Sequence, residues 1–287
     1  MKEQEFIEII KKQTNSKFIG DDCAYLPEFG IVVTQDNFTQ DVHFKKEWST
    51  PYQIGYKAAA VNISDILASG AKPEYISVGL SLPNNTDDNF VKELYRGITE
   101  GSYGAKIIGG DITGADKIFI SITAIGSTAG RNISSRSNAK PGYIIITHGK
   151  YGESKKGYEE LKLGLKSSDS ISAHLEPKLE PEFSERISCN IKEDYAMMDT
   201  SDGLADALFK IGEASNVTVS VEDTEGIFGF EDYYLVAAVP ERFLHNLKDK
   251  TYYKIGKVLD FNGSYLEING IKFSDYNQLN TYNHFMK

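Results

Sequence analysis

The sequence predicts an α+β protein with two domains, and three observations support that expectation. Its 287 residues suffice for one large domain or two ordinary ones, with ample core. The hydrophobic content of 40% and the charged content of 25% are those of a globular protein. Helical and strand patterns follow one another without strict alternation, which favours α+β layers over an alternating parallel sheet.

Helices are expected where apolar residues recur with a period near 3.6, and strands where they alternate or form short continuous runs. The first helix is amphipathic and highly charged, which distinguishes it from a signal peptide. In chain order, the predicted elements are helix 2–13, strand 31–36, helix 52–69, strand 76–82, helix 86–103, strand 117–126, strand 143–147, helix 153–165, helix 202–214, strand 217–222, strand 233–240 and helix 240–247.

A boundary between two halves of similar size is expected at residue 135. The polar stretch 130–138 leads into Lys140-Pro141-Gly142, a combination typical of turns and linkers. We therefore expect an N-terminal domain of residues 1–135 and a C-terminal domain of residues 136–287. Each domain carries its own aspartate motifs.

Composition disfavours several classes of protein. A net charge of −10 argues against nucleic-acid binding, which requires a basic face to neutralise phosphates. The two cysteines, Cys23 and Cys189, form no disulfide framework and no metal-ligand spacing, so we expect reduced thiols. Apolar runs stay below the roughly 18 residues that a membrane span requires. The expectation is a cytoplasmic protein without a membrane or nucleic-acid partner.

Four aspartate motifs place carboxylates among small or apolar residues that offer no cation. They are Gly20-Asp21-Asp22, Val61-Asn62-Ile63-Ser64-Asp65, Gly109-Gly110-Asp111 and Thr200-Ser201-Asp202-Gly203. A buried carboxylate without a partner is costly or takes up a proton. Mg²⁺ supplies the missing charge, because it takes oxygen ligands and keeps waters and substrate phosphates as the remainder. The pattern predicts a nucleotide held through metal ions.

Asp65 is the most informative of these residues. Its predicted helix is apolar nearly all round, so the carboxylate is expected to be buried. There it either coordinates a metal or pairs with an arginine from elsewhere in the chain. Asp21 and Asp22 are adjacent and repel each other unless a cation bridges them, although a simple aspartate-rich turn also fits that motif.

Asp36, Asp41 and His43 come at the end of a buried-looking strand, where ligands are commonly bound. Asp36 is therefore a metal candidate. His43 could donate a hydrogen bond to a phosphate or a ribose, but a lone histidine is more often a packed structural residue.

Gly109 and Gly110 allow a backbone to approach phosphate closely, with the Asp111 carboxylate beside a metal and Thr113 as a hydroxyl neighbour. Two-glycine turns are common, so this motif is weak by itself.

The segment 199–204 is expected to open a helix, since Thr200, Ser201 and Asp202 are all good N-cap residues. Capping explains one of these residues without a ligand, but it leaves Asp199 as a second, unexplained acid. Patterns for a nucleophilic triad, a GxxxxGK[ST] loop or a GxGxxG loop do not occur.

In this order and spacing, the motifs resemble the thiamine-monophosphate kinase family, whose superfamily includes aminoimidazole ribonucleotide synthetase, selenophosphate synthetase and a hydrogenase-maturation protein. The resemblance runs nearly from end to end. The matching segments are 20–24 (family GDDAA), 33–44 (TTD…EGVHF), 60–73 (AVNLSD-AAMGA-P), 109–113 (GGDTT), 136–142 (R-GA-PGD), 199–204 (D-SDGL), 231–233 (GEDYEL) and 283–285 (DHF).

The resemblance implies ATP-dependent phosphorylation of thiamine monophosphate to thiamine diphosphate, by direct γ-phosphoryl transfer with Mg²⁺ held by the aspartates. It also implies a two-domain fold like that of aminoimidazole ribonucleotide synthetase. The N-terminal half would bind ATP and Mg²⁺ and complete a barrel across a homodimer, and the C-terminal half would be an α/β sandwich. Phosphoryl transfer depends on positioning and charge neutralisation more than on a reactive side chain, which agrees with an aspartate-rich site.

Carried over by position, the family's roles fall on named residues of this sequence. The implied metal ligands are Asp21, Asp22, Asp36, Asp65, Asp111 and Asp202, of which Asp111 and Asp202 are also the catalytic candidates. Contacts with ATP are implied for Gly109, Gly110, Thr113, Arg136 and Ser201. Contacts with the acceptor, thiamine monophosphate, are implied for His43, Asp41, Glu231 and Tyr282.

Departures from the family pattern gather in the C-terminal half. The chain is short between Val221 and Glu231, Tyr234 stands for the usual glutamate of GEDYEL, and residues 147–149 lack the usual threonine-glycine pair. Two alternatives therefore stay open: an ATP-using enzyme of the same superfamily with another phosphate acceptor, and a nucleotide-binding relative without turnover.

Overall fold

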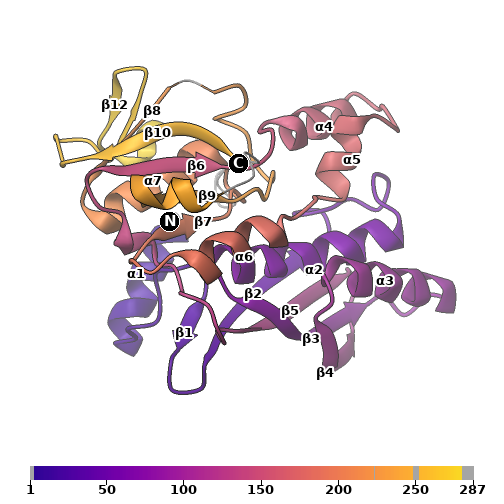
Figure 1. Ribbon diagram of the computed structural model, residues 1–287. Coiled ribbons are helices and arrows are strands. Elements are labelled where there is room, and N and C mark those ends of the chain that lie inside the picture. Colours follow the sequence, from indigo (N-terminus) through magenta and orange to yellow (C-terminus); the bar gives the residue numbers. More distant parts are fainter. Residues whose placement is uncertain (1–2, 223, 248–251, 280–287) are drawn as a thin grey trace.

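The chain forms two mixed β-sheets that share a continuous hydrophobic core. The computed structural model describes residues 3–222, 224–247 and 252–279. Figure 1 shows the sheet of the N-terminal half in its lower part and the sheet of the C-terminal half in its upper part. The largest buried cluster extends from Val32 and Ile66 of the first half to Ile144 and Phe183 of the second. This shared core packs the two halves against each other.

The first sheet has five strands in the order β1-β2-β5-β3-β4. Their bounds are β1 Ala24–Leu26, β2 Ile31–Thr39, β3 Lys72–Leu82, β4 Lys106–Gly114 and β5 Phe119–Ser127. β3 pairs with β4 in parallel, and the other neighbours are antiparallel. Alternate residues of β5 are buried, because α2 (Pro51–Ala68) and α3 (Asp88–Gly101) cover one face of the sheet (Figure 1).

Helix α2 owes its position to a strong start and to glycines at its crossing with α3. Thr50 caps the helix and forms a capping box with Gln53. A Cβ on Gly55 would lie 2.0 Å from the carbonyl oxygen of Leu94, and one on Gly97 would lie 2.0 Å from that of Tyr52. The absence of side chains at these glycines lets the two helices pack backbone to backbone, and α2 is buried on nearly all sides as expected.

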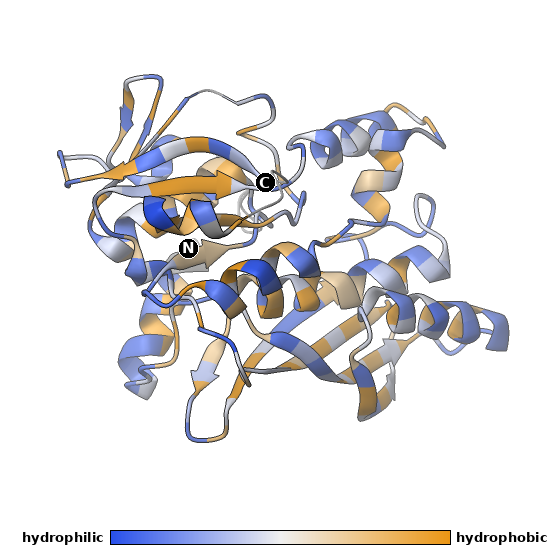
Figure 2. Cartoon of the chain, viewed as in Figure 1, coloured by the Kyte–Doolittle hydropathy of each residue, from blue (hydrophilic) through white to orange (hydrophobic). Residues whose placement is uncertain are grey.

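The second sheet has seven strands in the order β12-β11-β8-β10-β6-β9-β7. Their bounds are β6 Tyr143–Thr147, β7 Ala196–Met198, β8 Thr218–Val221, β9 Val236–Pro240, β10 Tyr253–Leu259, β11 Leu266–Ile268 and β12 Ile271–Phe273. All five residues of β6 are buried, and Figure 2 shows this strand as a largely hydrophobic band. Helix α7 (Leu204–Ser215) packs on the sheet through a second hydrophobic cluster.

The remaining helices are α1 Glu3–Thr14, α4 Glu153–Lys162, α5 Asp169–Leu175 and α6 Pro181–Asn190, with short 3-10 turns at Arg136–Asn138, Glu241–Asn246 and Tyr276–Leu279. α6 lies between the two halves (Figure 1), where the hydroxyl of Ser184 donates to the carbonyl of Leu67 at 2.6 Å. None of the helices in the described residues is long and apolar enough to cross a membrane.

The predicted α+β class is confirmed, but the predicted elements differ from the structure at several ends and leave several helices and strands out. The expected helix 240–247 is a 3-10 turn at Glu241–Asn246, and the expected helix at Asp202 begins only at Leu204. β4 is missing from the predicted strands, because its central glycines have low strand propensity. The sequence pattern also did not predict α5, α6, β1, β7, β10, β11 and β12.

Candidate functional site

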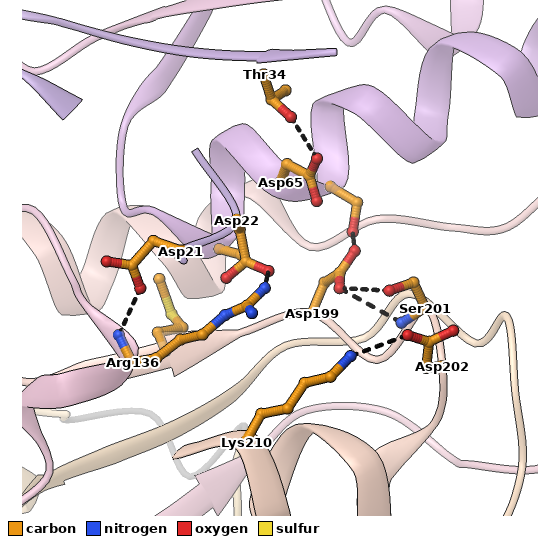
Figure 3. A network of polar contacts seen from close by, with 12 residues as sticks. Asp21, Asp22, Thr34, Asp65, Arg136, Asp199, Ser201, Asp202 and Lys210 are labelled. Carbon is orange, nitrogen blue, oxygen red and sulfur yellow. Dashed lines mark hydrogen bonds and ion pairs between the residues drawn. The ribbon is translucent and has the colours of Figure 1, made fainter. Parts of the chain in front are cut away.

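Three aspartates from different parts of the chain converge at the junction of the two halves. Asp22 precedes β1, Asp65 lies on α2, and Asp199 follows β7. One carboxylate oxygen from each lies within 4.8 Å of the others. Figure 3 shows the three side chains pointing toward one another. Oxygen donors at this spacing form a candidate site for a hard divalent cation.

Hydroxyl groups fix two of these carboxylates. The hydroxyl of Thr34, on β2, donates to Asp65 Oδ2 at 2.6 Å. Ser64, the neighbour of Asp65 on α2, donates to Asp199 Oδ2 at 2.6 Å. Ser201 donates its hydroxyl to Asp199 Oδ1 at 3.0 Å. Each carboxylate keeps further lone pairs that can face a cation.

The electrostatics of the cluster call for positive charge. Burial, followed by repulsion from Asp36, Asp199 and Asp22, raises the pKa of Asp65 well above its ordinary value. Burial and the charge of Asp22 raise the pKa of Asp199 to about 7. A divalent cation would relieve both effects, and the all-oxygen donor set suits Mg²⁺. The residues present therefore fit the metal that the sequence predicted.

Arg136 is a cation that pairs directly with this cluster. Its Nη2 donates to Asp22 Oδ1 at 2.6 Å, so the arginine considered for Asp65 pairs with Asp22 instead (Figure 3). The Nε of Arg136 is buried and has no hydrogen-bond partner among the described residues. A buried donor without a partner is costly, and an anionic oxygen would satisfy it.

Asp21 turns away from the three clustered carboxylates. It accepts hydrogen bonds from the hydroxyl of Ser135 and from the backbone N–H of Arg136, both at 2.8 Å. These bonds tie the aspartate turn to the segment that carries Arg136. Within one chain, Asp21 thus positions the site, while Asp22 faces its centre (Figure 3).

Asp36 lies in the middle of β2, which continues to Thr39, and not at the strand end as the sequence suggested. Its backbone N–H donates to Oδ1 of Asn62, on α2, at 2.9 Å. Its charge is the largest source of repulsion acting on Asp65. Asp36 therefore borders the cluster.

Asp202 follows the clustered Asp199 on a sharp loop. The N-cap of α7 is Gly203, with φ of 108° and no side-chain cap bond, so the expected capping by residues 200–202 was wrong. A Cβ on Gly203 would lie 2.2 Å from the carbonyl oxygen of Gly229, which explains the glycine. The carboxylate of Asp202 accepts from Lys210 at 3.0 Å and is free of a capping role (Figure 3).

Asp111 does not join the cluster within one chain. In the register of the sheet, Asp36 pairs with Ile122, which pairs with Val78, and Val78 pairs with Gly110. Asp111 is one residue further along, so its side chain faces the side of the sheet opposite to Asp36. All nine residues of β4 are exposed.

The glycines beside Asp111 serve the sheet. A Cβ on Gly110, whose φ is 156°, would lie 1.8 Å from the carbonyl oxygen of Val78. Gly109 has φ of 149° and open space around it. The hydroxyls of Thr113 and Ser81 share a hydrogen bond of 3.1 Å across β4 and β3.

The residues expected at the acceptor lie in two places. His43 Nδ1 accepts from the N–H of Thr39 at 3.0 Å and stacks on Phe38, while Asp41 pairs with Lys117 at 2.9 Å. Glu231 belongs to the C-terminal half, and its carboxylate pairs with Lys57, on α2 of the N-terminal half, at 3.1 Å. Tyr282 and the motif 283–285 lie outside the described residues.

Asp199 is the site residue that sequence reasoning left unassigned. Its signal was a second acid beside the presumed cap, directly after a buried strand. Lys57, a buried lysine on α2, and Lys210 also carry charge into this region and were not predicted.

Comparisons with known proteins cover almost the whole chain. Residues 20–128 match the family model "AIR synthase related protein, N-terminal domain". The thiamine-monophosphate kinase of Bacillus subtilis (strain 168) is 34% identical over 262 residues, which are 81% of this chain and 80% of that protein. The thiamine-monophosphate kinase of Aquifex aeolicus is 28% identical over 291 residues, which are 91% of this chain and 92% of that protein.

Solved structures agree with the sequence relatives. The structure named "AaThiL complexed with AMPPCP and TMP" has a TM-score of 0.87 and 26% identity, and the match covers 99% of this chain and 97% of that one. A crystal structure of thiamine monophosphate kinase from Aquifex aeolicus has a TM-score of 0.81 at 26% identity and covers 95% and 99% of the two chains.

Proposed function

Because the chain belongs to the thiamine-monophosphate kinase family, we propose that it transfers the γ-phosphoryl group of ATP to thiamine monophosphate, giving thiamine diphosphate and ADP. In this reaction an oxygen of the acceptor phosphate bonds to the γ-phosphorus. The bond from that phosphorus to the bridging oxygen breaks, and ADP leaves with the electron pair. Such a transfer needs positioned charge and no nucleophilic side chain.

The observation that carries the proposal is the cluster of Asp22, Asp65 and Asp199. Its three carboxylates lie close together and are only partly neutralised by Arg136; burial, followed by the charge of neighbouring aspartates, raises the pKa of Asp65 and Asp199. When bound there, Mg²⁺ would neutralise charge on the phosphoryl oxygens. Asp36 and Asp202 border the same space and are the further ligands we propose.

The remaining groups of the site act on the phosphates and the acceptor. Arg136 offers to a phosphate oxygen its Nε–H, which has no partner among the described residues, while Asp22 holds the guanidinium in place. Ser201, beside Asp202, supplies a further hydroxyl toward ATP. We propose His43, Asp41, Glu231 and Tyr282 for the acceptor by position in the family pattern alone.

Two further parts of the proposal concern the architecture. We propose domains of residues 1–135 and 136–287, since the first sheet ends at Ser127 and the second begins at Tyr143. We also propose a homodimer in which the exposed side of the first sheet completes a barrel. Three isoleucines of the edge strand β4, Ile107, Ile108 and Ile112, are exposed, which supports β4 as part of the dimer surface. In a dimer, Gly109, Gly110, Asp111 and Thr113 of this exposed strand would meet the nucleotide.

We place the protein in the cytoplasm, where ATP is available as the donor. The free state of both cysteines, Cys23 and Cys189, is consistent with a reducing compartment.

A coupled assay of ADP release tests the function. We expect turnover that requires thiamine monophosphate, ATP and Mg²⁺ together. Turnover with a different phosphate ester but not with thiamine monophosphate would favour another acceptor. Binding of ATP without release of ADP with any ester would identify a relative without turnover, and either result would contradict the proposal.

A further inference from the structure

Lys57 is a buried cation that the proposed chemistry does not use. It lies on α2, its side chain is 4% exposed, and its Nζ is 3.1 Å from Glu231 Oε2. Burying an ammonium and a carboxylate together costs desolvation free energy, so such a pair is weak support for stability. The best-attested role of such buried pairs is to fix how two structural elements are aligned with each other.

Glu231 connects this pair to the loop of the aspartates. Its backbone N–H donates to the carbonyl oxygen of Ser201 at 2.7 Å, and its φ is 55°, a conformation that a non-glycine residue adopts only when its surroundings hold it. Close by, Thr200 donates its hydroxyl to the carbonyl oxygen of Tyr234 at 3.0 Å. Segments 199–202 and 231–234 therefore hold each other by two hydrogen bonds.

The other contacts of segment 231–234 anchor it to the C-terminal half. His174, on α5, lies 3.4 Å from Glu231 Oε2 through its Nδ1, which also shares a 3.0 Å hydrogen bond with Ser154. The carboxylate of Asp232 accepts from the N–H groups of Gly152 and Ser154, at 2.9 and 3.2 Å. From the N-terminal half, Lys57 reaches this segment through its ion pair with Glu231.

α2 thus touches the aspartate loop at two points two helical turns apart. Ser64 holds Asp199 directly, and Lys57, seven residues earlier on the same side of the helix, holds the loop through Glu231. We propose that Lys57 is a positioning residue. Through Glu231 it fixes segment 199–202 against α2, and this keeps the carboxylates of Asp199 and Asp202 in position relative to Asp65. The effect on catalysis rests on the proposed function, whereas the effect on the loop does not.

The test compares Lys57→Met, Glu231→Gln and the double variant with the wild-type chain. Lys72→Met is the matched control, since it removes the ammonium of an exposed pair 2.8 Å from Glu74. The first readout is hydrogen exchange of the backbone amides of residues 199–203 in the metal-free full chain. We expect at least tenfold faster exchange there for Lys57→Met, unchanged exchange in β5, and wild-type exchange for the control.

The second readout is steady-state kinetics with ATP, Mg²⁺ and thiamine monophosphate. A displacement of about 1 Å of the aspartate loop is expected to lower kcat by about 10- to 100-fold. The KM for ATP should change less, because Arg136 and Asp22 keep their contacts. The double variant should be no slower than the slower single variant, since both changes break one interaction.

A merely structural pair would give different results. Exchange that accelerates equally in β5 and in residues 199–203, or a folded Lys57→Met with wild-type exchange and kcat, would overturn the proposal. If Lys57→Met does not fold, Glu231→Gln decides by the same exchange measurement. If the wild-type chain does not phosphorylate thiamine monophosphate, the proposed function fails, and the exchange comparison still decides the role of Lys57.

Discussion

Replacing Asp199 by asparagine should stabilise the metal-free protein while abolishing turnover. Burial and the charge of Asp22 raise the pKa of this carboxyl from an ordinary 3.8 to about 7 in the folded chain. Below pH 3.8 it is protonated in the folded and unfolded states alike. Between pH 3.8 and 7 only the unfolded chain ionises, so folding loses free energy as the pH rises through that window.

The size of the effect follows from the two pKa values. Each pH unit between them corresponds to about 1.4 kcal/mol, so the ionised Asp199 destabilises the metal-free fold by about 4 kcal/mol at pH 8. At pH 5 the same reasoning gives a destabilisation of about 2 kcal/mol. Asparagine is neutral at every pH. Its amide oxygen can accept from Ser201, and its NH2 group can donate to the hydroxyl oxygen of Ser64.

Thermal unfolding in the presence of a chelator measures this difference. At about 2 °C per kcal/mol for a chain of this size, the Tm of Asp199→Asn should exceed that of the wild type by about 8 °C at pH 8 and by about half as much at pH 5. Asp194→Asn, at an exposed pair with Lys140, is the control and should leave Tm unchanged. A variant with a lower Tm than the wild type at pH 8, or an advantage that does not shrink toward pH 5, would refute the assignment of uncompensated charge.

Three further predictions follow from single contacts. Arg136→Met should raise the KM for ATP by at least tenfold, because Asp22 and a phosphate oxygen both lose their donor; an unchanged KM in the ADP-release assay would show that Arg136 does not contact ATP. Burial and the charge of Lys57 lower the pKa of His174 to about 3, so only the unfolded chain takes up this proton as the pH falls from 6.5 toward 3. Wild-type stability should therefore fall by about 2 kcal/mol more than that of His174→Gln between pH 7 and 5, and parallel denaturant midpoints would count against a buried neutral imidazole. Gly97→Ala should destabilise the chain by about 1–3 kcal/mol in chemical denaturation, since its Cβ would meet the carbonyl oxygen of Tyr52; wild-type stability would mean that α2 and α3 can separate without cost.

Local pattern predicted the buried helix of Asp65 well and the start of α7 poorly. The apolar residues of α2 recur on all sides of the helix, and this is sufficient to predict burial. At residues 200–203, three good N-cap residues precede a glycine, and propensity favours any of the three. The close approach of Gly229 to Gly203 places the start of the helix after Gly203, and that contact joins residues 26 positions apart in sequence.

The sequence by itself determined the chemistry of the site: carboxylates in apolar surroundings, in an order and spacing that resemble one family of phosphotransferases. Only the tertiary structure decided which of them share one space. Asp199 enters the cluster because β7 ends beside α2, where the hydroxyl of Ser64 donates to its carboxylate. Asp111 stays outside within one chain, because the register of four strands turns its side chain to the other face of the sheet. Side-chain type is local information, whereas the face of a sheet depends on pairings between distant segments.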